Sequence, residues 1–377
     1  MINPFNPEPF SLSSALPTLL IIPTGIGCTL GGFAGDAIPA ARLLASASGC
    51  LITHPNVMNG ASLYWSDSNI HYVEGYSLDQ FAIEKISLRP VRKQQVGLLL
   101  DSGLDNQSKQ RHIQVALSCK ATLGIDVGPI ITTEAPLEIH LRQGNSGTSW
   151  GTLSQVEALL KAGKMLKEAG ATAIAVVTRF PDCLDSQAIQ KYQAGEDVDI
   201  LSGAEAVISH LLVKHLSIPC AHAPALKSIP LNEGLDPRAA AEEIGHTFLP
   251  CVLVGLSKAP DLIPINKEQF TQSITNSEYI HMNQVGAVIA PDGALGGEAV
   301  LASLERNIPL IVVSNKNILN VNFQSLIMHH ESFSKENLRI LHAKNYVEAA
   351  GLILLLREGL NVESIYRPIN SINEIKT

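Results

Sequence analysis

The sequence of 377 residues has no run of lysine or arginine, and its 35 acidic side chains outnumber its 27 basic ones, for a net charge of −8. Surfaces that bind nucleic acid or anionic membranes need clustered positive charge. The charge balance therefore argues against nucleic acid and membranes as partners. It predicts a small-molecule ligand, or another copy of the same chain, as the partner.

No two of the six cysteines have the C-x-x-C spacing typical of zinc sites, and their scatter gives no disulfide framework. We therefore expect free thiols in a reducing compartment. Cys28 lies in a glycine-rich loop, where it is either a nucleophile or, as small buried cysteines more often are, a core residue.

Residues 9–35 carry no charged side chain, which invites a signal-peptide or membrane interpretation. The segment lacks a basic leader, however, and Pro17, Pro23 and the glycines would interrupt a spanning helix. The sequence thus predicts a soluble, cytoplasmic protein.

Apolar runs alternate with amphipathic segments along the chain, and the clearest run, 172–177, has no polar alternation. Such strands are typical of parallel sheets that helices cover on both faces. The sequence predicts an α/β fold with mostly parallel sheets and Rossmann-like strand, loop and helix units. At this length we expect an N-terminal region 1–145 and a C-terminal region 146–377, or one interlocked domain.

Three local patterns add to this outline. Residues 251–256 are apolar and predict a buried strand, whereas residues 218–225 contain two prolines and predict a loop. Asp101 directly follows the apolar strand 96–100, at the edge where open α/β sheets bind ligands, although solvated acids are also common there.

Five glycines lie within the eleven residues 25–35, between the apolar run 20–22 and a helix. Glycine at this density indicates a backbone that takes positive φ or lets a ligand come close. The dinucleotide fingerprint is not met, because three residues separate Gly27 from Gly31 and His54 stands where an acid is needed. NAD and FAD are therefore disfavoured as cofactors.

Asp36 closes this loop and precedes a helix that has Pro39 in its first turn. As an N-cap, its carboxylate would occupy the amides that otherwise attract an anion. Asp36 is therefore either a helix cap or a residue that faces a cation, a metal ion or a protonatable group of a substrate.

A unit near the C-terminus repeats the pattern of the first. Leu-Gly-Gly-x-Ala occurs at 30–34 and at 295–299, in each case between a strand and a helix. The two units are either related halves or two glycine-rich loops used alike. If both loops lie at one edge of a sheet or across a cleft, a ligand sits between them.

The candidate site residues lie in or near these loops. The catalytic candidates are titratable: Asp36, His54, Lys258, Asp292 and Glu298. The ligand-binding candidates are small or carry amides or hydroxyls: Thr24, Gly25, Gly27, Gly31, Gly32, Asn56, Asn59, Ser146, Ser149, Gly293, Gly296 and Gly297.

These groups suit an enzyme that acts on a small anionic or phosphorylated metabolite between the two glycine-rich loops, with Mg²⁺ as one candidate cofactor. The spacing of the acids gives no metal-ligand signature, so the metal ligands are left unassigned. The alternative is a non-catalytic ligand sensor or assembly factor that uses the same cleft.

Four motifs carry a resemblance to a known family. They are Pro-Thr-Gly-Ile-Gly at 23–27, Gly-Gly-x-Ala-Gly-Asp at 31–36, Ile-Thr-His-Pro-Asn at 52–56 and Leu-Gly-Gly at 295–297. The chain resembles, over nearly its whole length, a family of functionally uncharacterised proteins of cyanobacteria and plant chloroplasts. The resemblance implies a cyanobacterial or plastid-type protein and supplies no activity, so the site rests on the residues themselves.

Overall fold

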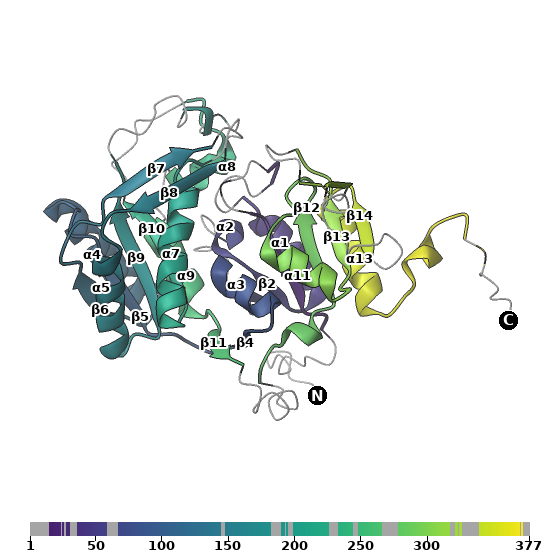
Figure 1. Cartoon of the computed structure of the whole chain (residues 1–377), viewed down its shortest axis with the longest axis horizontal. Coiled ribbons are helices and arrows are strands. Elements are labelled where there is room, and N and C mark those ends of the chain that lie inside the picture. Colours follow the sequence, from purple (N-terminus) through teal and green to yellow (C-terminus); the bar gives the residue numbers. More distant parts are fainter. Residues whose placement is uncertain are drawn as a thin grey trace.

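Two parallel sheets, each covered by helices, make up the computed structural model of the chain (Figure 1). The structure describes residues 15–23, 25, 28–30, 36–58, 67–144, 148–181, 190–192, 194, 199–225, 233–243, 248–265, 278–316, 321–322, 324–325, 339–369 and 371. The predicted α/β class with parallel sheets is confirmed.

Six of the described strands form the first sheet, in the order β14-β13-β12-β1-β2-β3, and all run parallel. Their bounds are β1 Thr18–Leu20, β2 Leu51–Thr53, β3 Ile70–Tyr72, β12 Ala287–Pro291, β13 Leu310–Val313 and β14 Ile340–Ala343. The chain adds β2 and β3 on one side of β1 and later adds β12 to β14 on the other. This order is that of doubly wound nucleotide-binding sheets, and its topological switch point lies between β1 and β12.

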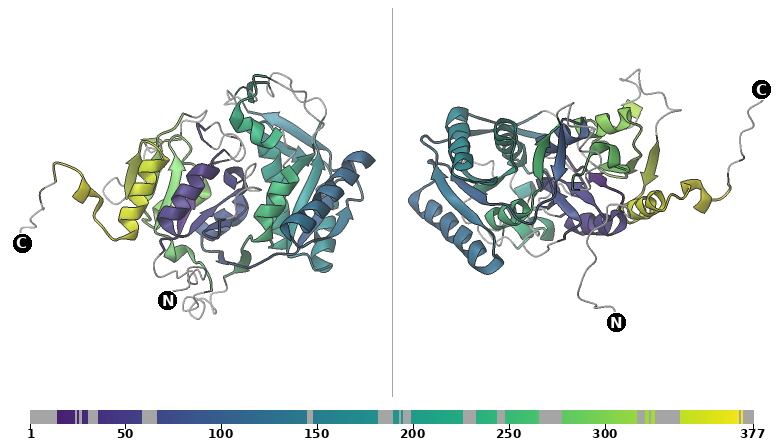
Figure 2. Two further views of the ribbon diagram at one scale, coloured as in Figure 1. Left: turned by 180° about the vertical axis from the view of Figure 1, so that it is seen from behind. Right: turned by 90° about the horizontal axis from the view of Figure 1, so that it is seen from below.

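Helices α1 (Ile38–Ser48) and α13 (Tyr346–Arg357) lie side by side on one face of this sheet, in purple and yellow in the left view of Figure 2. Helices α3 (Gly75–Ala82) and α11 (Glu298–Glu305) pack together on the other face. Local sequence sets the end of α1, because Gly49 takes a left-handed φ of 75° and donates its N–H to Ala45 O at 2.8 Å.

Four further described strands form the second parallel sheet, in the order β10-β9-β5-β6. They are β5 Val96–Leu100, β6 Val127–Thr132, β9 Ala173–Arg179 and β10 Cys220–Ala225. The apolar residues of α5 (Val156–Glu168) and α7 (Ser202–Leu216) pack on one face of this sheet, and those of α4 (Asn106–Leu123) and α9 (Phe248–Ser257) on the other. We call each sheet with its helices a lobe, the first lobe holding β1 and the second holding β5.

The second lobe is inserted between β3 and β12 of the first. The chain enters it through β4 (Ile86–Arg89) and returns through β11 (Asp261–Pro264), and these strands pair antiparallel. Both sheets take strands from either side of residue 145, so they group the chain differently from the regions 1–145 and 146–377. The remaining short elements are α2 Pro55–Met58, β7 Ile139–Gln143, β8 Ser149–Leu153, α8 Pro237–Glu243, η2 Met282–Gln284 and η3 Val362–Ile365.

Two apolar layers run through both lobes. One joins α3 and α11 of the first lobe to α5 and α7 of the second, and the other joins α1 and α13 to α4 and α9. At the junction, the ring of Tyr72 lies so close to α9 that a Cβ on Gly255 would be 2.7 Å from its Cε2. The lobes are therefore packed together as one body rather than joined by a loose linker.

Two predicted elements are wrong. Residues 251–256 belong to helix α9, which packs against strands of the second sheet on one side and α2 on the other, so no polar face reveals its helical period. Residues 220–225 form strand β10 instead of a loop. Among the described strands β10 pairs only with β9, and an edge position of this kind tolerates proline at position 224.

The proposed capping role of Asp36 is also wrong. Helix α1 begins at Ile38, its N-cap residue is Ala37, and no side chain caps it. Pro39 does lie in the first turn, where its fixed φ suits a helix start.

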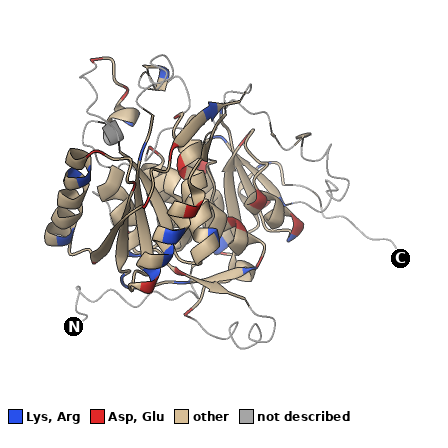
Figure 3. Cartoon of the chain, turned by 60° about the vertical axis from the view of Figure 1, so that its left-hand side comes forward, with Lys and Arg blue, Asp and Glu red and all other residues tan. Residues whose placement is uncertain are grey.

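Acidic and basic residues are interspersed along the described part of the ribbon in the view of Figure 3. Among the described helices, none combines the length and the apolar character needed to cross a bilayer.

Candidate functional site

The loops that follow β1 and β12 lie at the same edge of the first sheet, because these strands are parallel neighbours with Leu20 opposite Ile289. This is the carboxyl edge at the switch point, where doubly wound sheets bind their ligands. Of the candidate residues, Thr24, Gly27, Gly31, Gly32, Asn59 and Ser146 lie outside the described residues. The others can be placed.

Hydrogen bonds link the loop after β1 to the loops after β13 and β12. The Thr29 amide donates to Asn315 Oδ1 at 2.7 Å, and the Lys316 amide donates to Thr29 Oγ1 at 3.0 Å. Asn315 Nδ2 in turn donates to the Asp292 carbonyl at 3.4 Å. The carboxyl ends of β1, β12 and β13 thus carry one connected set of loops.

Gly25 brings the second lobe onto this edge. Its φ is +74°, and the Ser149 amide of β8 donates to its carbonyl at 3.1 Å. A Cβ at Gly25 would lie 2.8 Å from the Ser149 carbonyl oxygen, so both φ and space require glycine. The Ser149 hydroxyl itself bonds within the second lobe, to Ser202 Oγ at 3.1 Å and from the Gly203 amide at 3.2 Å. Ser149 therefore lies at the start of a hairpin strand that contacts Gly25 of the glycine-rich loop.

The charge of Asp36 shifts the pKa of two side chains around the loop, Cys28 and Tyr346. Burial, and then the charge of Asp36, raise the pKa of the Cys28 thiol to about 12, although a hydrogen bond from Asn315 opposes the shift. Burial and the charges of Cys28 and Asp36 also raise the pKa of Tyr346. Cys28 is thus a protonated thiol at neutral pH, which favours a packing role over a nucleophilic one.

Arg238 of α8 brings a positive charge to the same loop. Its Nη1 donates to the Thr29 carbonyl at 3.5 Å, and Asp236 holds its Nε at 2.9 Å. The hydrogen bond from Arg238 to Asp236 is the largest cause of the raised pKa of the guanidinium, and the charge of Asp36 contributes as well. The second lobe therefore sets a cation against the loop that follows β1.

His54 and Asn56 hold the end of β1 in place. The Ile22 amide donates to His54 Nε2 at 3.0 Å, and Asn56 Nδ2 donates to the Ile22 carbonyl at 3.0 Å. Burial, and then the charge of His210, lower the pKa of His54 to about 4. His54 is thus a neutral acceptor for the backbone, which makes it a poor candidate for a proton carrier.

Acid should destabilise the protein through His54. In the unfolded chain this group takes up a proton below its ordinary pKa of 6.5, whereas in the folded chain it stays neutral down to about pH 4. Stability is therefore lost as the pH falls from 6.5 toward 4, by about 2 kcal/mol at pH 5. In urea titrations at pH 7 and pH 5, the His54→Gln variant, which keeps an acceptor for Ile22, should lose less stability than wild type by that amount. Equal losses would show that His54 is protonated in the folded protein.

An acid–base pair that the sequence did not reveal spans the two lobes at this edge. Glu74, directly beyond β3, accepts a hydrogen bond from His210 of α7 with an Nε2 to Oε1 distance of 2.9 Å. Asp79 of α3 lies close enough for its charge to act on His210, and burial raises the pKa of Asp79 to about 6. Glu74 could have been found from its place after the apolar strand, but nothing in the sequence around His210 marks it.

The second glycine-rich loop contributes acids to the same region. Glu298 is exposed in the first turn of α11, and its charge acts on Asp79, whose Oδ1 accepts the Ala299 amide at 3.2 Å. Asp292 Oδ1 accepts the amide of Gly293, which has a φ of +82°. Gly296 and Gly297 are exposed beside them.

Lys258 is not brought to this edge. It follows the end of α9, next to Ala259, whose carbonyl accepts Gln94 Nε2 at 2.8 Å just before β5 begins. This is the amino edge of the second sheet. Among the described residues, no group of three or more His, Cys, Asp or Glu side chains could hold a metal ion.

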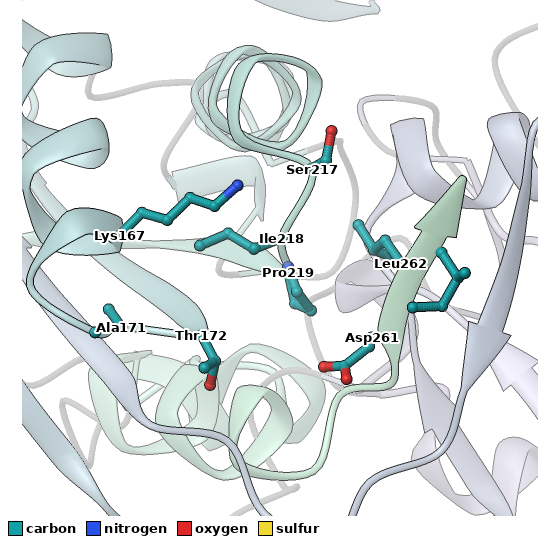
Figure 4. A pocket seen from close by; sticks show the side chains of 10 residues that line it. Lys167, Ala171, Thr172, Ser217, Ile218, Pro219, Asp261 and Leu262 are labelled. Carbon is teal, nitrogen blue, oxygen red and sulfur yellow. The ribbon is translucent and has the colours of Figure 1, made fainter.

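A groove of about 400 Å³ also lies at the amino edge, between β11 and the starts of β9 and β10 (Figure 4). Its polar groups are already engaged, since Lys167 Nζ donates to the Leu216 carbonyl at 2.6 Å and Asp261 pairs with Arg89 at 2.6 Å. The groove lies at the opposite edge from the loops and supplies no acid–base chemistry of its own.

We use the name crevice for the carboxyl edge of the first sheet, that is, for the loops after β1, β12 and β13 and the residues of the second lobe that contact this edge. Its described residues are Gly25, Cys28, Thr29, Asp36, His54, Glu74, Asp79, Ser149, His210, Arg238, Asp292, Glu298, Asn315 and Lys316.

Comparison with known proteins confirms an uncharacterised family that has a cyanobacterial member. A protein of the cyanobacterium Synechococcus sp., named an uncharacterized lipoprotein, is 47% identical over 351 residues, which is 93% of each chain. A solved structure of acetone carboxylase in its nucleotide-free form has 14% identity and a TM-score of 0.17, and covers 55% of this chain and 29% of its own, which is too little likeness to support any inference. Residues 17–366 match the family described as protein of unknown function DUF3326, and the chain belongs to that family.

Proposed function

We propose that the protein is an enzyme that binds a small anionic or phosphorylated metabolite in the crevice. The observation that carries this proposal is the meeting of three loops and the second lobe at the switch point of a doubly wound sheet. Ligands of such sheets bind outside the carboxyl ends of the strands, at the place where the strand order reverses.

The charges around the first loop support an anionic ligand. The guanidinium of Arg238 approaches the Thr29 carbonyl from α8, and the backbone amide of Lys316 donates to Thr29 Oγ1, so a cation and a donor amide stand beside Thr29. The left-handed turn at Gly25 holds the start of this loop against β8 of the second lobe. Asp36 limits how much negative charge can enter and favours a ligand that also carries a protonatable group.

The pair of Glu74 and His210 favours an enzyme over a non-catalytic sensor or assembly factor. A sensor needs donors that recognise the ligand, whereas turnover also needs titratable groups that can exchange a proton with it. The pair stands at the same sheet edge as the loops, and each lobe supplies one member.

A thermal-shift screen with phosphorylated and carboxylated metabolites tests the binding site. A ligand present at 100 times its Kd should stabilise the wild type by about 2.7 kcal/mol. The Arg238→Gln variant should bind the same compound at least tenfold more weakly, because its guanidinium is the cation set against Thr29.

The matched control is Arg89→Gln, which removes an arginine that is also held through Nε and Nη2 by an aspartate, on the β4–β11 ribbon at the amino edge. This variant should bind the compound as the wild type does. The proposal fails if no anionic compound stabilises the wild type, or if both variants lose binding equally.

We also propose a cytoplasmic location. Cys28, Cys50, Cys119, Cys220 and Cys251 are free and buried, as expected in a reducing compartment. Cell fractionation decides between this location and the membrane attachment implied by the name of the Synechococcus relative.

A further inference from the structure

The imidazole of His210 is held on one side and open on the other. The Glu74 side chain is 3% exposed, whereas that of His210 is 42% exposed. The second carboxylate oxygen of Glu74 accepts the Ser77 amide at 3.2 Å, which fixes the carboxylate at the start of α3. The buried Glu74 carboxylate thus accepts a hydrogen bond from the partly exposed His210 ring.

This contact determines which ring nitrogen can react. An ionised carboxylate only accepts hydrogen bonds, so the Nε2 of His210 must carry a proton to bond with Glu74 at 2.9 Å. In the neutral ring the lone pair then lies on Nδ1, for which the described part of the chain provides no hydrogen-bond partner. An acid that fixes the tautomer of a base by bonding to the other ring nitrogen recurs in acid–base catalysis.

Gly75 leaves room for the ring. A Cβ at this position would lie 3.1 Å from His210 Nε2 and 3.8 Å from its Cε1. Gly75 does not have a left-handed φ, so its backbone does not require glycine. The close approach of the imidazole from the other lobe is the reason that the structure gives for a glycine here.

Two acids of the first lobe, Glu74 and Asp79, face His210 and favour its charged form. The other neighbours of the ring are the neutral His54 and the ring of Tyr76, at 6.5 Å between centroids. Burial lowers the pKa of His210, but the hydrogen bond and charge of Glu74 and the charge of Asp79 more than offset it, so the pKa lies above its ordinary 6.5.

We propose that His210 is the proton-transferring residue of the crevice, with Glu74 as the residue that positions it. This inference rests on the function proposed above. The lone pair of Nδ1 takes a proton from an O–H, N–H or activated C–H bond of the bound metabolite, the electrons of that bond stay on the metabolite, and the imidazolium returns the proton to the product. No oxidant or second substrate is needed. Because the base and its positioning acid come from different lobes, the site is complete only when the lobes are packed.

The state of the ring can be measured without knowing the substrate. In protein with ¹⁵N-labelled histidine, His210 of the wild type should show the tautomer protonated at Nε2 at alkaline pH. In the Glu74→Gln variant its titration midpoint should move to lower pH. His112 is the internal reference, because its Nδ1 bonds to the Ser108 carbonyl at 2.7 Å and it lies in α4, away from Glu74, so its titration should not change.

Chemical modification tests whether Nδ1 is accessible. Diethyl pyrocarbonate, with the modified peptides identified by mass spectrometry, should label His210 faster than the buried His54 and His71. The pH profile of that labelling should shift to lower pH in Glu74→Gln. His210→Gln should retain the fold and lose the labelled peptide. A ring protonated at Nδ1, or labelling of His210 no faster than that of His54, would overturn the inference.

Inorganic phosphate separates this inference from the proposed function. Phosphate that stabilises the wild type and slows the labelling of His210 supports both. Stabilisation with no change in labelling removes His210 from the site but leaves the binding proposal intact. If phosphate gives no stabilisation, the anion site is contradicted, while the tautomer and the labelling profile still decide the role of His210.

Discussion

The Asp101→Ala variant is expected to be about 4 kcal/mol less stable than the wild type, because three backbone amides would lose their acceptor inside the second lobe. Asp101 is 1% exposed, and its carboxylate accepts the amides of Gly103 at 2.9 Å, Leu137 at 3.1 Å and Arg179 at 3.2 Å. These contacts join the carboxyl ends of β5 and β9 to the segment before β7.

Urea unfolding followed by circular dichroism measures this loss. The matched control is Asp105→Ala, which also removes an acceptor for a backbone amide, that of Ser108 at 2.8 Å, but at an exposed position where water can replace it. Asp101→Asn should fall between wild type and alanine, since its amide keeps one accepting oxygen. Equal stabilities for the two alanine variants would show that the amides around Asp101 find other partners.

The Gly203→Ala variant is expected to disrupt the junction between the lobes, at about 3 kcal/mol of stability. The added Cβ would lie 2.3 Å from the Ser149 carbonyl oxygen and 2.6 Å from the Trp150 Cα. Both are backbone atoms, so the start of α7 or strand β8 must move. The Ser149 amide would then lose its place against Gly25, and binding at the crevice should weaken together with the fold.

Gly351→Ala is the control for this variant. Gly351 lies inside α13, exposed, with no atom within 4 Å of an added Cβ. Alanine there should stabilise the protein by about 0.5 to 1 kcal/mol, because glycine is the poorer helix former. In differential scanning calorimetry, the transition temperatures of the two variants should therefore shift in opposite directions from that of the wild type. Similar shifts for both variants would show that β8 can yield to the extra methyl group.

The sequence predicted those elements whose signals are local. Helix α1 has Pro39 near its start and Gly49 just after its end, and strand β9 is an apolar run without polar alternation. Helix α9 was missed because it is apolar on all sides, and β10 because Pro224 is tolerated only at an edge that becomes apparent once the sheet is assembled.

The candidate site could be predicted only in its outline. The repeated Leu-Gly-Gly-x-Ala pointed to two loops used alike, and β1 and β12, which precede them, are neighbours in one sheet. The pair of Glu74 and His210 joins residues of different lobes that lie far apart in the chain, and no short pattern encodes such a contact. The backbone roles of His54 and Asp101 likewise depend on which amides the fold brings to them.

The paired strands β4 and β11 have a further consequence. Arg89 and Asp261 are cross-strand partners, so the chain enters the second lobe and returns from it at adjacent positions. If a tight turn joined these two residues in place of the second lobe, β4 and β11 would form an ordinary hairpin. The strand order of the first sheet would not change. The second lobe is thus one continuous insertion within the first. The two apolar layers hold the lobes together, since either lobe alone would expose to water an apolar face that the other lobe covers.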